Sequence, residues 1–234
     1  MIYKEAAFVI ETKEIADGIF QSRLNSPNIS VESKPGQFIN ILPSNHWQKV
    51  MRRPMSIASQ GNGEISIIYK VVGEGTRLMK NWHEKEVVDI IGPLGNYWTG
   101  FENTVPVLVG GGVGIAPILN LHHHLQSITI DHVLIMGARN KGEHFISHDP
   151  ENSIYLSSDD GSVGIKGNVV DALHFIFKGN NFPQDIKLFA CGPPMMMEGV
   201  RGYSIKNDIC CALALETIMA CGYGICQGCT VEKH

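Results

Sequence analysis

Cysteine is missing from the first 190 residues of this chain of 234, and all six cysteines follow at Cys191, Cys210, Cys211, Cys221, Cys226 and Cys229. A scaffold stabilised by disulfides would spread its cysteines along the sequence, so this distribution argues against that class. Clustered thiols, in a sequence whose start shows no basic-then-apolar leader pattern, favour metal ligation or redox chemistry in a reducing compartment. We therefore expect a cytoplasmic protein.

A strong charge of either sign is also lacking. The 19 basic and 23 acidic side chains leave a formal net charge of −4, which provides no field for a polyanion, so we expect no nucleic-acid partner. Residues 103–130 contain no Lys, Arg, Asp or Glu, but Pro106, Pro117 and the glycines between them would open backbone hydrogen bonds in lipid. We expect a soluble globular protein with no membrane partner.

The first hundred residues consist of short apolar runs separated by turn residues. Alternation with a period of two, punctuated by Pro-Gly and Gly-Asn-Gly, indicates an antiparallel sheet closed into a small barrel. The runs that we expect to be strands are residues 6–10, 38–42, 65–69 and 87–91. These features predict a β-barrel domain over residues 1–100.

A different hydrophobic pattern begins near residue 101. Continuous apolar runs alternate with helical stretches, which predicts a parallel α/β sheet of the Rossmann-like kind. We expect strands at residues 105–109, 132–136, 153–156 and 186–190, helices at 117–126 and 169–177, and a last core strand at 209–215. This domain is predicted to span residues 101–212, and residues 213–234 form a third, short unit.

The third unit carries Cys221, Cys226 and Cys229 at the spacing C-x4-C-x2-C within a glycine-rich stretch. That spacing is typical of a plant-type 2Fe-2S site, in which thiolates hold iron and backbone amides bond to the sulfurs. The alternatives are a reduced structural loop or a zinc knuckle, although zinc usually takes two separated pairs of ligands. We predict that the three cysteines are ligands of a 2Fe-2S cluster.

A fourth ligand is not evident after Cys229. Three completions are open: the sequence is a shortened form of a longer one, Cys210 or Cys211 folds back, or His234 binds as histidines do in Rieske centres. We favour the shortened form, because Cys210 and Cys211 stand in an apolar run where buried cysteines act as small hydrophobes. The neighbouring histidines 122–124 cannot converge on one ion from consecutive helical positions, and we expect them to be partly exposed.

A glycine-rich segment, residues 110–117, lies between a predicted strand and a predicted helix. Glycines let the backbone approach a pyrophosphate, while the helix amino terminus supplies amides and partial positive charge. Pro117 suits the first helical position. The alternative is a tight turn, since the run differs from the G-x-G-x-x-G fingerprint, but its place at the end of the first parallel strand favours ligand binding.

Three further segments have a functional and an ordinary interpretation. The run 52–56 offers arginine to a phosphate and Ser56 to a ring edge, or forms a surface turn. The run 70–76 ends in a glycine loop with a hydroxyl, suited to phosphate or ribityl contact, or forms a hairpin turn. Cys191 precedes a Gly-Pro turn at the ligand edge of the sheet, or is simply a buried thiol.

The order of these motifs resembles that of the ferredoxin-reductase-like flavoproteins over essentially the whole chain. The motifs are Arg53-Pro54-Met55-Ser56, Gly73-Glu74-Gly75-Thr76, Gly92-Pro93-Leu94-Gly95, residues 110–117 and Cys191-Gly192-Pro193. Within that group, residues 215–229 with the three cysteines, and Asp159-Asp160-Gly161-Ser162, resemble the electron transfer subunits of class B dihydroorotate dehydrogenases.

The resemblance implies a barrel that binds FAD, a domain that binds NAD and a terminal 2Fe-2S loop. The implied FAD residues are Arg53, Pro54, Met55, Ser56, Lys70, Val71, Val72, Gly75 and Thr76. The implied NAD residues are Gly111, Gly112, Gly114, Cys191, Gly192 and Pro193, with Cys191 and Ser56 as catalytic positions. Many relatives have an aromatic residue where Met55 stands, and a thioether can pack on a flavin instead.

The function implied by the resemblance is electron transfer between NAD and a partner flavin, through FAD and the cluster, in pyrimidine biosynthesis. The partner would be the FMN-containing catalytic subunit of dihydroorotate dehydrogenase, in a heterotetramer. Two alternatives are the small subunit of an NAD(P)H:ferredoxin oxidoreductase or sulfide dehydrogenase, and a scaffold without a cluster that stabilises a partner. A basic residue in the run 137–141, after the second parallel strand, also leaves NADP open as the nucleotide.

Overall fold

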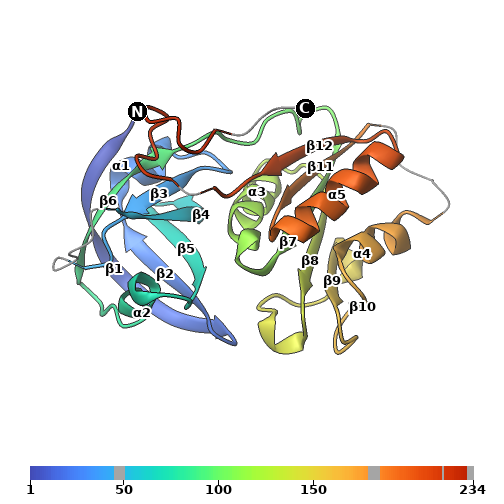
Figure 1. The fold of residues 1–234 in the computed structure, drawn as a ribbon, viewed down its shortest axis with the longest axis horizontal. Coiled ribbons are helices and arrows are strands. Elements are labelled where there is room, and N and C mark those ends of the chain that lie inside the picture. Colours follow the sequence, from blue (N-terminus) through green and yellow to red (C-terminus); the bar gives the residue numbers. More distant parts are fainter. Residues whose placement is uncertain (45–50, 179–184, 218, 231–234) are drawn as a thin grey trace.

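The computed structural model describes residues 1–44, 51–178, 185–217 and 219–230. Two units lie side by side, an antiparallel barrel built by the first half of the chain and a parallel sheet with helices built by the second (Figure 1). After its last strand the chain crosses back to the barrel, so residues 219–230 lie on the same unit as the amino-terminal strand (Figure 1).

The barrel is closed by six strands in the order β1-β2-β5-β4-β3-β6. They are β1 (Tyr3–Ala16), β2 (Ile19–Asn25), β3 (Phe38–Ile41), β4 (Arg53–Gly61), β5 (Glu64–Lys70) and β6 (Val87–Leu94), with the short helices α1 (Pro27–Glu32) and α2 (Glu74–Met79). Inward-facing isoleucines such as Ile39, Ile57 and Ile67 are fully buried in its core. Closure leaves no unpaired strand edge, which is how small antiparallel sheets avoid exposed backbone groups.

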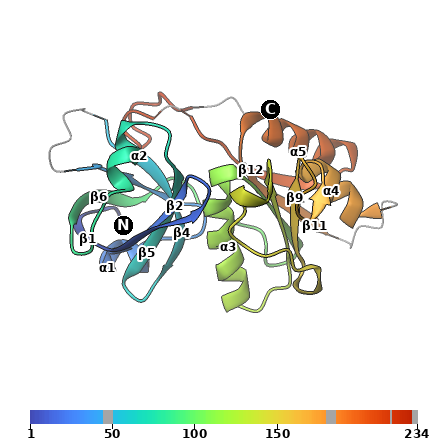
Figure 2. The ribbon, with the colours of Figure 1, turned by 90° about the horizontal axis from the view of Figure 1, so that it is seen from below.

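The second unit is a six-stranded parallel sheet in the order β10-β9-β8-β7-β11-β12. Its elements are β7 (Val105–Gly111), α3 (Ile115–Ser127), β8 (Val133–Ala138), β9 (Ile154–Ser158), β10 (Ile165–Lys166), α4 (Val169–Ile176), β11 (Ile186–Cys191), α5 (Pro194–Lys206) and β12 (Cys210–Ala214). Leu108 packs with α3, whereas Val107 and Val109 pack with α4 and α5. Helices therefore cover both faces, and α3 lies between sheet and barrel (Figure 2).

Helix α3 joins the two units by packing along the barrel strand β4. The side-chain amide of Asn120 donates a hydrogen bond of 3.1 Å to the carbonyl of Ile57, and both residues are buried. In the segment between the units, the indole of Trp98 donates to the carbonyl of Pro117 at 3.3 Å and packs edge-on against Phe189. A buried, hydrogen-bonded contact of this kind fixes the orientation of one unit on the other.

The fold class predicted from the sequence is confirmed by the barrel and the parallel α/β sheet. Helix α3 starts at Ile115, so Pro117 is its third residue and not its first. A single 3-10 turn over Gly112–Gly114 precedes the helix, and Pro117 still falls in the first turn, where an amide hydrogen has no helical partner. Strands β2 and β10 and helices α1, α2 and α5 were not predicted.

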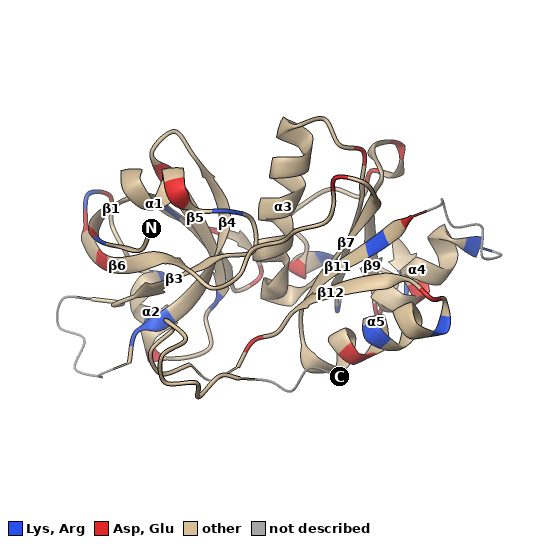
Figure 3. Cartoon of the chain, turned by 90° about the horizontal axis from the view of Figure 1, so that it is seen from above, with Lys and Arg blue, Asp and Glu red and all other residues tan. Residues whose placement is uncertain are grey.

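The placement of charged residues and the lengths of the apolar helices agree with the low net charge and the expected lack of a membrane span. Basic and acidic positions are interspersed over both units (Figure 3). Among the described residues, no helix combines the length and the apolar character needed to cross a bilayer.

Candidate functional site

The predicted nucleotide-binding residues lie where the winding of the parallel sheet reverses. Strands β7 and β11 are neighbours, with Cys191 opposite Gly110 in the register, and the chain leaves β7 toward α3 but leaves β11 toward α5 on the opposite face. Open α/β sheets bind ligands outside the carboxyl ends of their strands at such a switch point. The structure thus brings the glycine loop and the Cys191-Gly192-Pro193 turn to one edge.

The three glycines of this edge are needed for different reasons. A Cβ on Gly114 would lie 2.6 Å from the Cα of Gly192 and 2.7 Å from the carbonyl carbon and oxygen of Cys191. A Cβ on Gly111 would lie 2.4 Å from the sulfur of Met196. Gly112 has nothing within 4 Å in place of a side chain and a positive φ of 55°. Gly111 and Gly114 therefore permit close packing of two loops, while Gly112 is the one with open space for a ligand.

Cys191 ends β11 with its side chain inside the sheet. The residue is 1% exposed, and burial, with a smaller contribution from Glu216, raises the pKa of its thiol to about 12. A thiol in this state is neutral and weakly reactive. Its contribution at this edge is therefore as a small apolar group and not as a nucleophile.

The predicted flavin-binding residues come from two separate barrel segments that the fold brings together. Arg53 begins β4, and Gly75 lies in the first turn of α2. A Cβ on Gly75 would lie 3.3 Å from Cγ and from Nε of Arg53, so the loop and the guanidinium stem are packed against each other. A side chain at this position would crowd the arginine, which would have to shift by a few tenths of an ångström. The arrangement fits the cradle that a phosphate-bearing cofactor needs.

Alternation along β4 separates its predicted site residues. Met55 is opposite Ile39 and packs against the barrel core, whereas Pro54 and Ser56 are opposite Asn40 and Phe38 on the outer face. Residues directly opposite each other in an antiparallel pair share a face. Ser56 is therefore placed to meet a ligand on the outer face, while the side chain of Met55 is directed to the core.

Side chains at the end of β5 and just after it also face different sides of the barrel. Val71 packs against the barrel core and Val72 is exposed. The hydroxyl of Thr76 accepts hydrogen bonds from the backbone amides of Val72 and Gly73, at 3.0 and 3.1 Å, so it holds the shape of the loop. Lys70 forms an ion pair of 3.1 Å with Glu143 of the other unit.

Two of the three motif cysteines interact within the terminal loop. Hydrogen bonds from the backbone amides of Cys226 and Tyr223, and from the Cys226 side chain, lower the pKa of the Cys221 thiol to about 6. Gly222 and Gly224 adopt positive φ values of 74° and 77°, which turn the chain tightly around the sulfur. Amides directed at a thiolate are the chemistry that an iron-sulfur loop requires, and Cys221 and Cys226 fit that part of a cluster site.

Cys229 does not form a three-residue cluster with Cys221 and Cys226. Among the residues that the structure describes, no three His, Cys, Asp or Glu side chains are gathered closely enough to hold a metal ion. His234, considered above as a fourth ligand, lies outside the described residues. Cys210 is exposed at the start of the edge strand β12, which corrects the expectation that it is buried, whereas Cys211 packs partly into the sheet core.

Asn40 positions the cysteine loop, a role that was not predicted from the sequence. Its side-chain amide donates a hydrogen bond of 3.3 Å to the carbonyl of Cys221, and a Cβ on Gly222 would lie 2.3 Å from the same amide nitrogen. Asn40 is opposite Pro54 in the register of β3 and β4. A polar residue between buried Ile39 and Ile41 was the available signal. The terminal loop thus rests beside the strand that carries Arg53 and Ser56.

Comparisons with known proteins give the chain a family, although no family model matches it. The electron transfer subunit of dihydroorotate dehydrogenase B (NAD(+)) from Fusobacterium nucleatum subsp. nucleatum is 34% identical, over 98% of this chain and 90% of that protein. The subunit of the same name from Listeria monocytogenes is 30% identical, over 96% of this chain and 88% of that protein. The chain belongs to this family of electron transfer subunits. The resemblance seen in the sequence is confirmed.

Solved structures agree with this family. An NADH-dependent reduced ferredoxin-NADP oxidoreductase has a TM-score of 0.83 and 29% identity, over 96% of this chain and 81% of that one. Phthalate dioxygenase reductase has a TM-score of 0.69 and 16% identity, over 91% and 68%, and shares the fold.

Proposed function

We propose that this chain is the electron transfer subunit of a dihydroorotate dehydrogenase B. It would carry electrons between NAD and the flavin of a catalytic partner subunit, by way of FAD and a 2Fe-2S cluster, in pyrimidine biosynthesis. The observation that carries the proposal is the position of Asn40, which bonds to the cysteine loop and is opposite Pro54 of the flavin-binding motif. Two features that lie far apart in the sequence are adjacent on one face of the barrel.

The barrel residues would hold the flavin nucleotide. Arg53 packs on Gly75 at the start of α2 and is placed to pair with a phosphate, while Ser56 on the outer face of β4 would meet the ring system. The hydroxyl of Thr76 keeps the loop in shape through the amides of Val72 and Gly73. Pro54, Met55, Lys70 and Val71 complete the proposed site, with Met55 acting through its backbone because its side chain faces the core.

The sheet edge would bind the nicotinamide nucleotide. Gly112 leaves open space at the amino end of α3, where a pyrophosphate meets helix amides, and Gly111 and Gly114 keep this loop against the Cys191-Gly192-Pro193 turn. When bound, FAD would exchange a hydride with NAD and single electrons with a cluster held by Cys221, Cys226 and Cys229. The protein contributes position and water exclusion, and the neutral, buried Cys191 closes the edge without introducing charge.

The proposed partner is the FMN-containing catalytic subunit, in a cytoplasmic heterotetramer. The name of the relatives, electron transfer subunit, supports a partner subunit in general. We also keep the division into residues 1–100, 101–212 and 213–234 as a proposal for the flavin, nucleotide and cluster units. A ferredoxin-linked oxidoreductase is the second candidate, favoured by the similarity to the ferredoxin-NADP oxidoreductase structure.

Purification from the native host tests the assignment. We expect the chain to copurify with a flavin-containing subunit that oxidises dihydroorotate, and to show flavin and iron-sulfur absorbance that NADH bleaches without oxygen. A preparation that reduces ferredoxin and has no dihydroorotate-oxidising partner would favour the second candidate. A flavin band with neither iron-sulfur absorbance nor bleaching by NADH would refute both.

Variants of Asn40 test the link between the two cofactors. Asn40→Ala removes the bond to the Cys221 carbonyl, so we expect slower electron transfer beyond the flavin while NADH still reduces the flavin at the original rate. Asn81→Ala is the matched control, because Asn81 follows α2 and its side chain donates to the carbonyl of Arg77 inside that helix. Equal rates in the two variants would contradict the positioning role of Asn40.

A further inference from the structure

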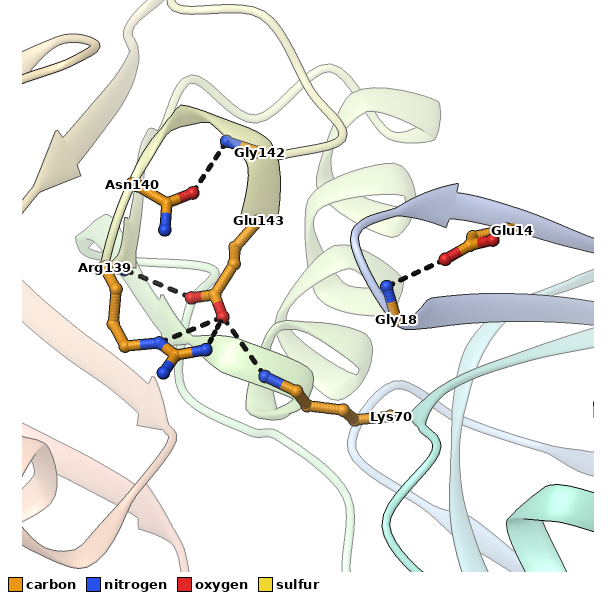
Figure 4. A network of polar contacts seen from close by, with 7 residues as sticks. All are labelled: Glu14, Gly18, Lys70, Arg139, Asn140, Gly142 and Glu143. Carbon is orange, nitrogen blue, oxygen red and sulfur yellow. Dashed lines mark hydrogen bonds and ion pairs between the residues drawn. The ribbon is translucent and has the colours of Figure 1, made fainter.

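Glu143 lies between the two units and bonds to cations from both (Figure 4). Its carboxylate accepts hydrogen bonds from Nε and Nη2 of Arg139 and from the Arg139 backbone amide, with the Nε contact at 3.0 Å and the amide contact at 3.2 Å. The same carboxylate accepts from Nζ of Lys70 at 3.1 Å. Lys70 ends the barrel strand β5 and belongs to the proposed flavin site, whereas Arg139 follows strand β8 of the sheet.

The surroundings of Glu143 fix its carboxylate in the charged state. Its side chain is 11% exposed, compared with 71% for Arg139. The Arg139 guanidinium lowers the pKa of Glu143 to about 2, and the Lys70 ammonium also lowers it. The backbone amide of Asp17, in the β1–β2 turn, donates to the carbonyl of the adjacent Gly142 at 2.9 Å. The barrel therefore holds the Glu143 turn by a backbone bond as well as by charge.

Arg139 occupies the place where a dinucleotide site distinguishes its cofactors. Strand β8 is next to β7, whose glycine loop would bind the pyrophosphate, and Arg139 comes directly after β8 at the same edge. In sites of this kind an arginine accommodates the 2′-phosphate of NADP, whereas an acidic residue suits the free ribose hydroxyls of NAD. The sequence alone shows only the arginine. The structure shows that the guanidinium of Arg139 is already hydrogen-bonded to the carboxylate of Glu143.

We propose that Glu143 is a specificity-determining residue, which excludes 2′-phosphorylated nucleotides by pairing with Arg139 and stays in place through Lys70. The inference rests on the proposed NAD site. A 2′-phosphate would have to displace Glu143 from the guanidinium and would lie beside its negative charge. Asp159, close enough to Arg139 to raise its pKa, adds to this repulsion. A nucleotide without the phosphate meets neither obstacle.

Replacement of the Glu143 charge should shift the preference toward 2′-phosphorylated nucleotides. Lys70, Arg139 and Glu143 together carry a formal charge of +1, and Glu143→Gln raises it to +2 while it keeps the size of the side chain. Arg139 would then have its guanidinium available for a phosphate, as a charge-assisted and bidentate pair. We expect E143Q to bind 2′-phosphorylated nucleotides more tightly and others without change.

Titration calorimetry with 5′-ADP and 2′,5′-ADP tests this without any flavin turnover. We expect E143Q to bind 2′,5′-ADP about tenfold more tightly than the natural chain, with 5′-ADP affinity within roughly twofold, since a charged hydrogen bond is worth at least that factor. The double variant R139A/E143Q should lose the gain. Glu151→Gln, an equal change of net charge at an exposed position in the same unit, should show no gain.

Each outcome has a distinct meaning. An E143Q gain for 2′,5′-ADP that the double variant retains, or no gain at all while 5′-ADP still binds, would overturn the role of Glu143 and leave the NAD site intact. If the natural chain binds no 5′-ADP, the nucleotide site itself is wrong, and the inference fails with it. A parallel change of both ligands in E143Q would show that the substitution alters the loop in general, which also contradicts the specificity role.

Discussion

Gly114→Ala should destabilise the sheet unit through steric overlap alone. Gly114 has φ −62° and ψ −10°, a conformation that alanine adopts freely, so no backbone strain enters. The added Cβ would lie 2.6 Å from the Cα of Gly192 and 2.7 Å from the carbonyl carbon and oxygen of Cys191. All three are backbone atoms at the junction of β7 and β11, and they cannot turn away as a flexible side chain would.

The expected cost is at the upper end of the range for overpacking, about 3 kcal/mol. In a chain of this size that corresponds to a fall of about 6 to 12 °C in Tm. Calorimetry or urea unfolding followed by circular dichroism measures it. Gly202→Ala is the matched control, because Gly202 lies inside α5 with nothing within 4 Å of its Cβ position. There the same substitution should stabilise, by about 0.5 to 1 kcal/mol.

The two substitutions should change the stability in opposite directions, so the comparison separates steric overlap from a general effect of alanine. If Gly114→Ala unfolds at the Tm of the natural chain, the packing of the glycine loop against the Cys191-Gly192 turn is not as described. If both variants lose stability to the same extent, the loss reflects alanine in general and the steric argument fails.

Three other changes have defined outcomes. Between about pH 7 and pH 4, His122 should lower the free energy of unfolding by about 3 kcal/mol, because the folded state lowers its pKa from 6.5 to about 4 and the unfolded chain takes up the proton first. The fall in the urea midpoint over this pH range should be smaller in His122→Gln and unchanged in His83→Gln. In the metal-free chain, iodoacetamide should modify exposed Cys210 while Cys191 stays protected until unfolding, and peptide mass spectrometry showing early labelling of Cys191 would contradict its burial. Asn120→Ala should cost about 1 to 2 kcal/mol in urea unfolding because it leaves the buried carbonyl of Ile57 unpaired, and an unchanged midpoint would mean that the bond contributes nothing.

The sequence predicted the helices and strands that are marked by a hydrophobic pattern or turn residues within their own segment. The apolar run that became β7 and the glycines after it were enough to place a strand, a loop and a helix at the ligand edge. Helix α5 was missed because Gly199 and Gly202 lower its helical propensity, and only its packing on the sheet compensates. For β4, Arg53 and Pro54 left a surface turn as the alternative to a strand that presents Ser56, and the barrel decides for the strand by pairing both residues with β3.

The relations between distant residues could not be predicted from pattern. Gly111 and Gly114 were interpreted as open to a ligand, but their neighbours are Met196, Cys191 and Gly192, which only the fold brings near. The prediction that histidines 122–124 are all partly exposed was wrong for His122, which is buried and 2.7 Å from a ring nitrogen of His132. These contacts depend on how α3 lies on the sheet, and a single sequence does not encode that visibly.

The packing of α3 on β4 connects the proposed nucleotide site to the proposed flavin site. The helix begins at the glycine loop, and its Asn120 holds the carbonyl of Ile57, next to Ser56 in the strand of the flavin motif. If the sheet unit shifted, β4 would therefore move with it, and the distance between the proposed flavin and nucleotide sites would stay the same. A substitution that loosens α3 on β4 should therefore change the rate of electron transfer between the proposed sites before binding of either cofactor is lost.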